Sequence, residues 1–428
     1  MRTIISRLAL TLLVVSLGLL PTTGHAQGEA PLLPARSALS LEAALDRARR
    51  ASPLLAAARA DLAAADGRVR QAGALANPTL SWQYERTSAG GLRNAQHITT
   101  LEQPIAVGVR AARIRSAELR RRLAAEALRA VELDLALTVT RAYARAIAAD
   151  RHVVLGEAAQ AAFDRATRIS AERRAAGDIS AYADRRIRIE AARYAALLAQ
   201  ARMTQRATRR ELAALVAPEA APHAIDSLPL QMERGPTLTL SADSAVAIGL
   251  AMHPDLRSAT LALEAAEADS RLVLVERRPA PTLIAGLKTE QASGLGGLDG
   301  IAAGMSLPLP VLDRRAGMID AARAGSARAT ADLTQQRMRT RVEILDALDG
   351  VRAIDAQLMM LAPSLGDEAT RALRAAEAAY AEGEIALLDW LDAVRSVHEA
   401  ESAFALVQSE SLIRRAQLAR ALGLPSLP

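Results

Sequence analysis

Apolar residues recur at alternating spacings of four and three along one long stretch of the chain, from about Val109 to Ala176. This heptad pattern is typical of a helix that packs lengthwise against another helix. A second apolar stripe beside the first indicates packing on more than one side. The mostly apolar first stripe comprises Leu119, Leu123, Glu126, Ala130, Leu133, Leu137, Thr140, Ala144 and Ile147, and the second comprises Leu128, Val131, Leu135, Val139 and Ala142. An unbroken helix of this extent would be roughly 100 Å long.

Two long helical runs end at turns of the same type, in which glycine is followed by an acidic residue and isoleucine. The first run closes at Gly177, Asp178, Ile179 and Ser180; the second, from about Asp313 to Glu382, closes at Gly383, Glu384 and Ile385. Glycine permits a tight chain reversal that would strain other residues. The sequence therefore predicts two helical hairpins, each with a returning helix after its turn.

Short amphipathic strands precede both helical runs. Leu80, Trp82 and Tyr84 alternate with polar residues, which is the period of a strand with one oily and one polar face. We expect strands at about 78–85, 95–103, 282–290 and 301–307, with a Gly-rich loop over 292–300 between the last two. The oily face is predicted to carry Leu80, Trp82, Tyr84, Leu283, Leu287, Ile301 and Met305. Trp82 and Tyr84 suit either the core of a soluble hairpin or the lipid interface of a membrane barrel.

The order of helix, strands and helical run occurs twice in the chain. Pro53 matches Pro254 at an offset of 201 (254 − 53), and Gly177 matches Gly383 at an offset of 206 (383 − 177). This period is far too long for a solenoid repeat. We predict a first repeat over 27–216, with strands about 78–104 and a helical hairpin about 109–216. A linker follows at 217–237, and the second repeat spans 238–428, with strands about 281–310 and a hairpin about 313–422. Within the first repeat, Ser40 is expected to cap one helix from Leu41 to about Leu75.

The N-terminus has the features of a secretory signal peptide, predicted over residues 1–26. Arg2 and Arg7 precede an apolar segment from Leu8 to Leu20, and small residues near Ala26 suit cleavage. The alternative, a membrane anchor, requires a longer apolar span. The sequence therefore predicts an exported protein.

Composition excludes several classes of function. Hydrophobic residues make up 51% of the chain but aromatic residues only 2%, which favours thin, closely packed helices. Arginines alternate with acidic residues, so the net charge of +6 indicates solvated helix faces rather than a nucleic-acid surface.

Cysteine is absent, so disulfides and lipidation at an N-terminal cysteine are excluded. No catalytic constellation stands out. No two of the six histidines have ligand spacing, so no metal or cofactor is predicted.

Four amphipathic strands are too few to close a barrel, and an open sheet leaves its edges unpaired. If the oily face meets lipid, the edges must be closed by other chains, because lipid offers no partner for free N–H and C=O groups. Several copies of an exported chain would then share one outer-membrane barrel, with the helices hanging into the periplasm.

Nearly all of the mature chain resembles the outer membrane efflux protein family, the TolC-like channels. The resemblance rests on the duplicated unit, the paired Gly-acid-Ile turns and two strand-to-helix junctions, Gln103–Arg110 and Ser306–Arg314. The Pro-Leu-Pro-Val-Leu-Asp-Arg sequence of the second junction is most similar to the heavy-metal branch of the family. The members of that heavy-metal branch work with proton-driven metal-cation pumps.

This resemblance implies a mainly α protein with a small β part. Three chains would share a twelve-stranded outer-membrane barrel, a periplasmic α-helical tunnel and an equatorial domain. Residues 217–236 and the segment after Leu422 are candidates for the equatorial domain. The family conducts substrates passively from an inner-membrane RND-type pump and a periplasmic adaptor, without a cofactor.

The resemblance also assigns roles to the two turns. They would form periplasmic tips that close the tunnel and contact the adaptor, and nearby residues would form a gate latch. The latch candidates are Tyr380, Asp184, Asp389, Arg173, Arg174 and Arg185. The alternative for these side chains is ordinary pairing on helix surfaces. Two other functions stay open: a channel for drug efflux or type I protein secretion, and a soluble periplasmic coiled-coil adaptor.

Overall fold

The computed structural model describes residues 38–217, 227–229, 238–292, 294, 296–361 and 367–427. The predicted signal peptide and most of the predicted linker lie outside these ranges. The first half contains α1 (Leu41–Ala51), α2 (Pro53–Ala72), β1 (Thr79–Ala89), β2 (Leu92–Pro104), α3 (Val109–Ala176) and α4 (Ala181–Val216). The second half contains α5 (Ala242–Met252), α6 (Pro254–Glu276), β3 (Thr282–Ala292), β4 (Gly296–Ser306), α7 (Ala316–Leu361), α8 (Asp367–Glu382) and α9 (Leu387–Leu422).

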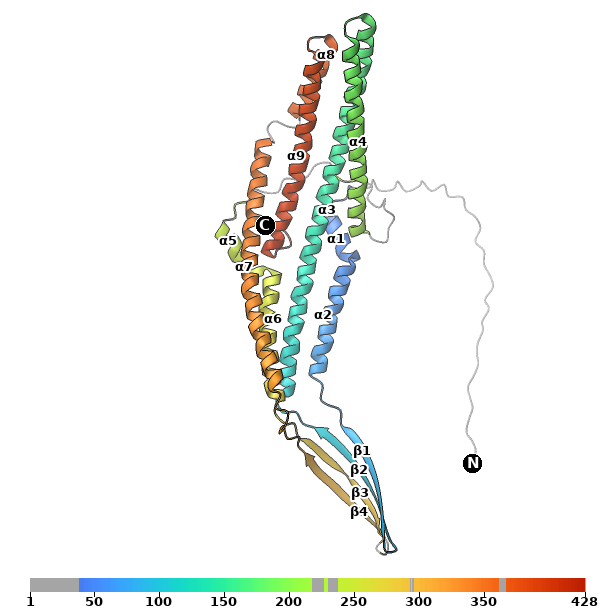
Figure 1. Ribbon diagram of the computed structural model, residues 1–428, viewed down its shortest axis with the longest axis vertical. Coiled ribbons are helices and arrows are strands. Elements are labelled where there is room, and N and C mark those ends of the chain that lie inside the picture. Colours follow the sequence, from blue (N-terminus) through green and yellow to red (C-terminus); the bar gives the residue numbers. More distant parts are fainter. Residues whose placement is uncertain are drawn as a thin grey trace, which may run out of the picture. The chain divides into compact units, whose positions relative to one another are not determined.

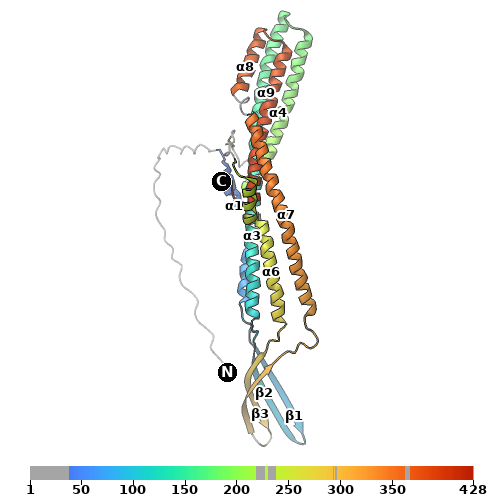
Figure 2. The ribbon, with the colours of Figure 1, turned by 90° about the vertical axis from the view of Figure 1, so that its left-hand side faces the viewer.

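Helix α3 is the element on which most of the other helices pack. It contacts α2 and α6 along its first part and α4 and α9 along its later part (Figures 1 and 2). Its 68 residues match the predicted run, and Leu133, Ala144 and Ile147 of the predicted first stripe are buried. The second stripe is also buried at Leu135, Val139 and Ala142, so the prediction of packing on more than one side is confirmed.

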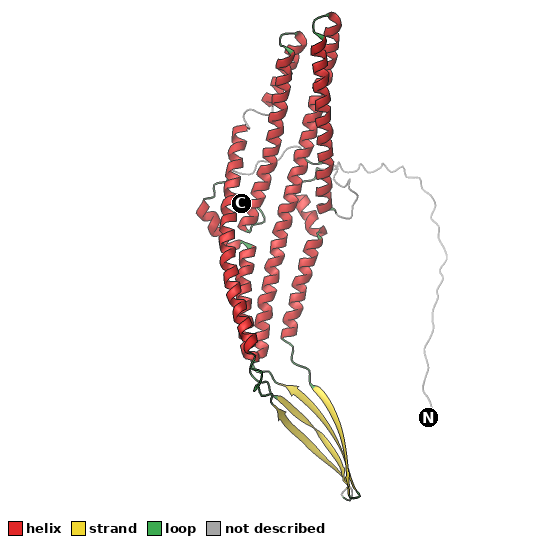
Figure 3. Cartoon of the chain, viewed as in Figure 1, coloured by secondary structure: helices red, strands yellow, loops and turns green. Residues whose placement is uncertain are grey.

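The four strands form one antiparallel sheet in the order β1-β2-β3-β4 (Figure 3). The central pair, β2 with β3, joins the two halves of the chain. Trp82 lies opposite Thr99, Thr99 opposite Leu287, and Leu287 opposite Ile301, so these residues share one face of the sheet. In the described part of the chain, no helix has an apolar stretch long enough to cross a membrane.

The prediction of one helix from Leu41 to about Leu75 is wrong, because the chain breaks at Ser52. Proline at position 53 disfavours helical backbone in the preceding residue, and Ser52 is extended, with φ −72° and ψ 116°. The Ser52 hydroxyl then accepts a hydrogen bond from the Leu55 amide at 3.3 Å and caps α2. His253 and Pro254 separate α5 from α6 by the same extended backbone, but the His253 side chain does not cap α6.

The predicted second run, from about Asp313 to Glu382, is divided between α7 and α8, and residues 362–366 between them lie outside the described ranges. Helix α7 begins only at Ala316. Arg315 has a φ of 55°, and its amide donates to the Asp313 carboxylate at 2.7 Å, which holds a non-helical turn.

The strands are longer than predicted. The loop expected over 292–300 is shorter, since β4 already begins at Gly296 and Gly300 pairs with Lys288. Backbone hydrogen bonds between strands need no side chain. The glycines of β4 therefore pair with β3, although they do not produce the alternation of apolar and polar residues that predicts a strand.

Candidate functional site: two helical tips and a two-faced sheet

The first tip is the reversal between α3 and α4. Gly177 has a φ of 88°, in the left-handed region that favours glycine, and ends α3. The Asp178 amide donates to the Arg173 carbonyl at 2.8 Å and closes the turn. The Ser180 hydroxyl accepts from the Ala183 amide at 3.2 Å and caps α4. Gly177, Asp178, Ile179 and Ser180 therefore lie where the sequence places a tip.

The second tip, between α8 and α9, has the same backbone and a different cap. Gly383 has a φ of 81°, and the Glu384 amide donates to the Ala379 carbonyl at 2.9 Å. Ala386 occupies the capping position and has no side-chain oxygen. Instead, the Asp389 carboxylate accepts from the Ala386 amide at 3.2 Å. Asp389, one of the latch candidates, thus serves to cap α9 within the single chain.

Asp184 is a buried carboxylate below the first tip, with 1% of its surface exposed. Arg174 donates to it at 2.9 Å, Ser170 at 3.3 Å, and the Arg188 guanidinium lies at 3.3 Å. Burial raises the pKa of Asp184, but these hydrogen bonds and charges outweigh burial and lower the pKa overall. The candidate Arg185 is exposed. The sequence analysis missed Arg188 and Ser170, although their spacing from Asp184 and Arg174 is helical.

Tyr380 is buried below the second tip. The Arg173 guanidinium lies 5.7 Å from the centre of its ring and donates to the Tyr380 carbonyl at 3.2 Å. Trp390 stacks on the Tyr380 ring with the ring centroids 5.6 Å apart. Burial raises the pKa of the Tyr380 hydroxyl. Four of the six latch candidates therefore pair within the chain, Asp184 with Arg174 and Tyr380 with Arg173.

The two faces of the sheet differ in chemistry. Trp82, Leu287 and Ile301 are 64%, 69% and 85% exposed, and Leu80, Tyr84, Leu283 and Met305 on the same face are exposed as well. On the opposite face, Lys288 and Glu290 are only 38% and 27% exposed and form an ion pair at 3.0 Å. Asn94 donates to Glu290 at 2.8 Å, across β2 and β3. The predicted oily residues therefore share one outward face, and hydrogen-bonded polar residues fill the other.

Comparisons with known proteins agree with this arrangement. The outer membrane efflux protein profile matches residues 248–424. The cobalt-zinc-cadmium resistance protein CzcC of Cupriavidus metallidurans is 28% identical over 407 residues, 92% of this chain and 92% of that protein.

The chain is similar to the outer membrane efflux proteins, through residues 248–424 and, with CzcC, along nearly its whole length.

The family resemblance drawn from the sequence, including the likeness to the heavy-metal branch, is thereby confirmed. Two solved structures share the fold. A membrane protein from Pseudomonas aeruginosa has a TM-score of 0.73 at 22% identity, over 90% of both chains. CusC has a TM-score of 0.70 at 17% identity, over 91% of this chain and 93% of that one. The family is one of transport proteins, not of enzymes.

The chain also contains an aromatic cluster that the sequence analysis did not single out. Phe163 of α3 packs edge-on against Trp390 at 5.2 Å and tilted against Tyr194 of α4 at 4.7 Å. With Tyr380, these rings join both helical hairpins below the tips. Aromatic residues are rare in this chain, so the occurrence of four of them in the helices beside the two turns is the signal that could have revealed the cluster.

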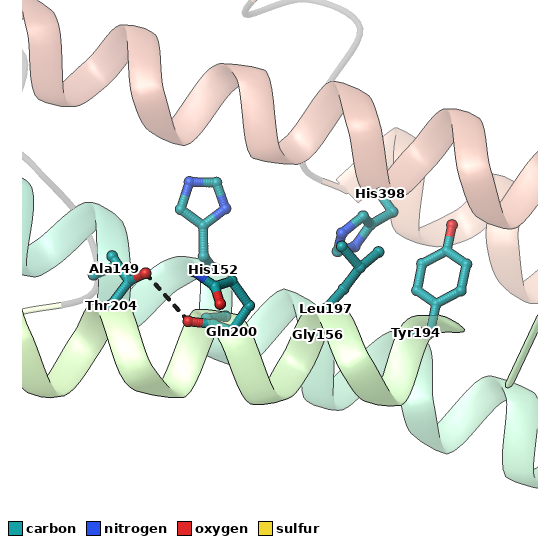
Figure 4. A pocket seen from close by; sticks show the side chains of 9 residues that line it. Ala149, His152, Gly156, Tyr194, Leu197, Gln200, Thr204 and His398 are labelled. Atoms are coloured by element: carbon teal, nitrogen blue, oxygen red, sulfur yellow. Dashed lines mark hydrogen bonds between the residues drawn. The ribbon is translucent and has the colours of Figure 1, made fainter. Parts of the chain in front are cut away.

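A pocket of about 220 Å³ lies beside this cluster, where α3, α4 and α9 meet (Figure 4). His152 of α3 and His398 of α9 both line it, together with Tyr194, Gln200 and Thr204 of α4. Burial lowers the pKa of both histidines. The His398 ring meets the Tyr194 ring edge-on at 5.3 Å.

Proposed function

We propose that this efflux protein is the outer-membrane channel of a tripartite efflux system, and that three copies share one barrel and one periplasmic tunnel. The observation that carries the proposal is the four-stranded sheet. One of its faces is oily and exposed, and β1 and β4 stand at its edges without a partner among the described residues.

A sheet of this kind is unstable in water and incomplete in lipid. Its oily face would be solvated in a lone soluble chain, and its edge N–H and C=O groups would lack partners inside a membrane. Pairing β4 of one copy with β1 of the next satisfies both edges. Three copies with four strands each give a closed barrel of twelve, large enough to surround a polar channel. The polar face with Lys288 and Glu290 would then line that channel.

The helices carry a surface that suits the same assembly. Tyr182, Ile189, Ala196 and Met203 are exposed and follow one another at intervals of seven along α4. An exposed heptad stripe is the pattern of a helix that packs lengthwise on a partner. Helices of a neighbouring copy would cover this stripe in a tunnel made of three chains.

The tips at Gly177–Ser180 and Gly383–Ile385 would contact the periplasmic adaptor of an RND-type inner-membrane pump. A signal peptide over 1–26 would direct the chain to the outer membrane without a lipid anchor. The repeats at 27–216 and 238–428 would each supply one strand hairpin and one helical hairpin. Residues 217–236 and those after Leu422 would belong to the equatorial domain.

Heavy-metal cations are the cargo that we propose. The support is the cobalt-zinc-cadmium resistance protein, to which the chain is similar along nearly its whole length. Drug efflux and type I secretion remain alternatives, because cargo is chosen largely by the pump. The soluble adaptor hypothesis is less well supported, since the similarity to outer membrane efflux proteins and the exposed apolar face of the sheet both favour a membrane channel.

Reconstitution tests the channel. The protein purified from outer membranes in detergent should be a trimer and should give discrete conductance steps in a planar lipid bilayer. A mature chain that is a stable monomer without detergent would overturn the proposal. Deletion of the gene should then sensitise cells to Co²⁺, Zn²⁺ or Cd²⁺, and sensitivity to drugs alone would reassign the cargo.

A further inference from the structure

His152 and His398 are separated by 246 residues (398 − 152), so no sequence spacing could pair them. The packing of α9 against α3 brings both imidazoles to one pocket (Figure 4). His152 extends from α3 toward α9, and His398 extends from α9 into the same space beside Leu197 and Tyr194.

Both imidazoles lack protein partners for their ring nitrogens. Among the described residues, neither side chain makes a hydrogen bond, and the edge-on contact with Tyr194 uses the His398 ring rather than a nitrogen lone pair. A half-buried imidazole usually has its nitrogens satisfied by a carbonyl, a carboxylate or water. Two such rings in one cavity therefore present up to two free lone pairs to whatever enters it.

In the described part of the chain, the carboxylates near the pocket do not hydrogen-bond to these nitrogens. Glu401 pairs with Arg151 at 3.1 Å and Glu157 with Arg202 at 2.9 Å, while Glu399 acts on His398 through its charge alone. No acidic residue lines the pocket; its other polar groups belong to Gln200, Thr204 and Tyr194. The Thr204 hydroxyl is bound to the Gln200 carbonyl at 3.2 Å.

We propose that His152 and His398 form a low-affinity binding site for a divalent transition-metal cation. Imidazole nitrogen is a ligand for Zn²⁺, Co²⁺, Ni²⁺ and Cu²⁺, whereas Mg²⁺ and Ca²⁺ prefer oxygen donors. A cavity of about 220 Å³ has room for the cation with several water ligands. Within the described residues no three metal-binding side chains come together, so two protein ligands would give weak, rapidly exchanging binding.

The site goes beyond channel function, and its test requires neither conductance nor export. The full-length protein purified in detergent is titrated with Co²⁺, and the visible absorption of the bound ion is followed. We expect one histidine-dependent site per chain. His152→Ala and His398→Ala should each weaken binding by at least about tenfold, because loss of even an outer-shell partner has an effect of that size. His97→Ala is the matched control, since His97 is exposed on the sheet, and it should bind as the wild type does.

A second variant tests the geometry directly. The chain has no cysteine, so a His152→Cys/His398→Cys double variant contains the only thiols. If the two positions can hold one ion, the double variant should bind Cd²⁺ more tightly than either single variant, with an ultraviolet thiolate-to-metal band. Unchanged Co²⁺ affinity in the His→Ala variants would overturn the proposal. A double variant that binds Cd²⁺ no better than the single variants would also overturn it.

Discussion

The two tips share a backbone turn but differ in the side chains beneath it. Asp184 lies seven residues after Gly177, and Trp390 lies seven residues after Gly383; both are 1% exposed. Three residues before each glycine stand their partners, Arg174 at 2.9 Å from Asp184 and Tyr380 stacked on Trp390.

An ion pair in one tip is thus replaced by an aromatic pair in the other. A turn motif fixes where the chain reverses, and the residues one helical turn away decide whether charge or apolar burial stabilises the reversal. The first tip should therefore respond to pH and salt, and the second to loss of volume.

The largest effect is expected from Trp390→Ala. Trp390 contacts Phe163 and Tyr380, so its removal opens a cavity where the hairpins meet and should cost about 3–5 kcal/mol of local stability. Hydrogen exchange of the α8 and α9 amides measures this loss. Leu388→Ala is the control, because Leu388 lies in the same helix, is exposed and should change protection by less than about 0.5 kcal/mol. Equal loss of protection in the two variants would contradict the aromatic core.

The next effect is the acid sensitivity of the first tip. The pKa of Asp184 is lowered in the folded chain, so its stabilisation is present above the unfolded value of about 3.9. It is lost as the pH falls below that value and through the folded pKa. Asp184→Asn should therefore lower the melting temperature at pH 7 and lower it less at pH 3, as followed by circular dichroism. A constant difference between the two pH values would mean that the charge of Asp184 is not what stabilises the tip.

A smaller change in stability is expected from substitutions at the N-terminal caps of α4 and α9. Ser180 and Ala386 have almost the same backbone angles, with φ −72° and −73° and ψ 154° and 156°. Ser180→Ala should cost about 1 kcal/mol at the start of α4, because the Ala183 amide loses its acceptor. Ala386→Ser should protect the first amides of α9 by up to a similar amount. Hydrogen exchange measures both effects, and no gain from Ala386→Ser would contradict the idea that the first amides of α9 lack a side-chain acceptor.

A contact can be predicted from the sequence only when its residues lie close together in the chain. The sequence pattern predicts features that depend on residues close together in the chain. These are the bounds of α3, the positive φ at Gly177 and the apolar face of the strands. The break at Ser52 was also local, and the serine and proline that cause it stand in the sequence. By contrast, Arg173 reaches the Tyr380 carbonyl across 207 residues, and His152 meets His398 only because α9 packs on α3. No spacing rule predicts such partners.

Tyr380→Phe should have the smallest effect on the stability of the isolated chain. Any effect of this variant on conductance would therefore report on the gate rather than on folding. Among the described residues the Tyr380 hydroxyl makes no hydrogen bond, so its removal should change tip stability by less than about 0.5 kcal/mol. The latch prediction requires this hydroxyl to contact a neighbouring copy in a closed trimer. Tyr380→Phe with Asp184→Ala should then raise single-channel conductance in a planar bilayer above that of Asp184→Ala alone. If the two variants conduct equally, Tyr380 only packs on Trp390, and the gate must be held by other residues.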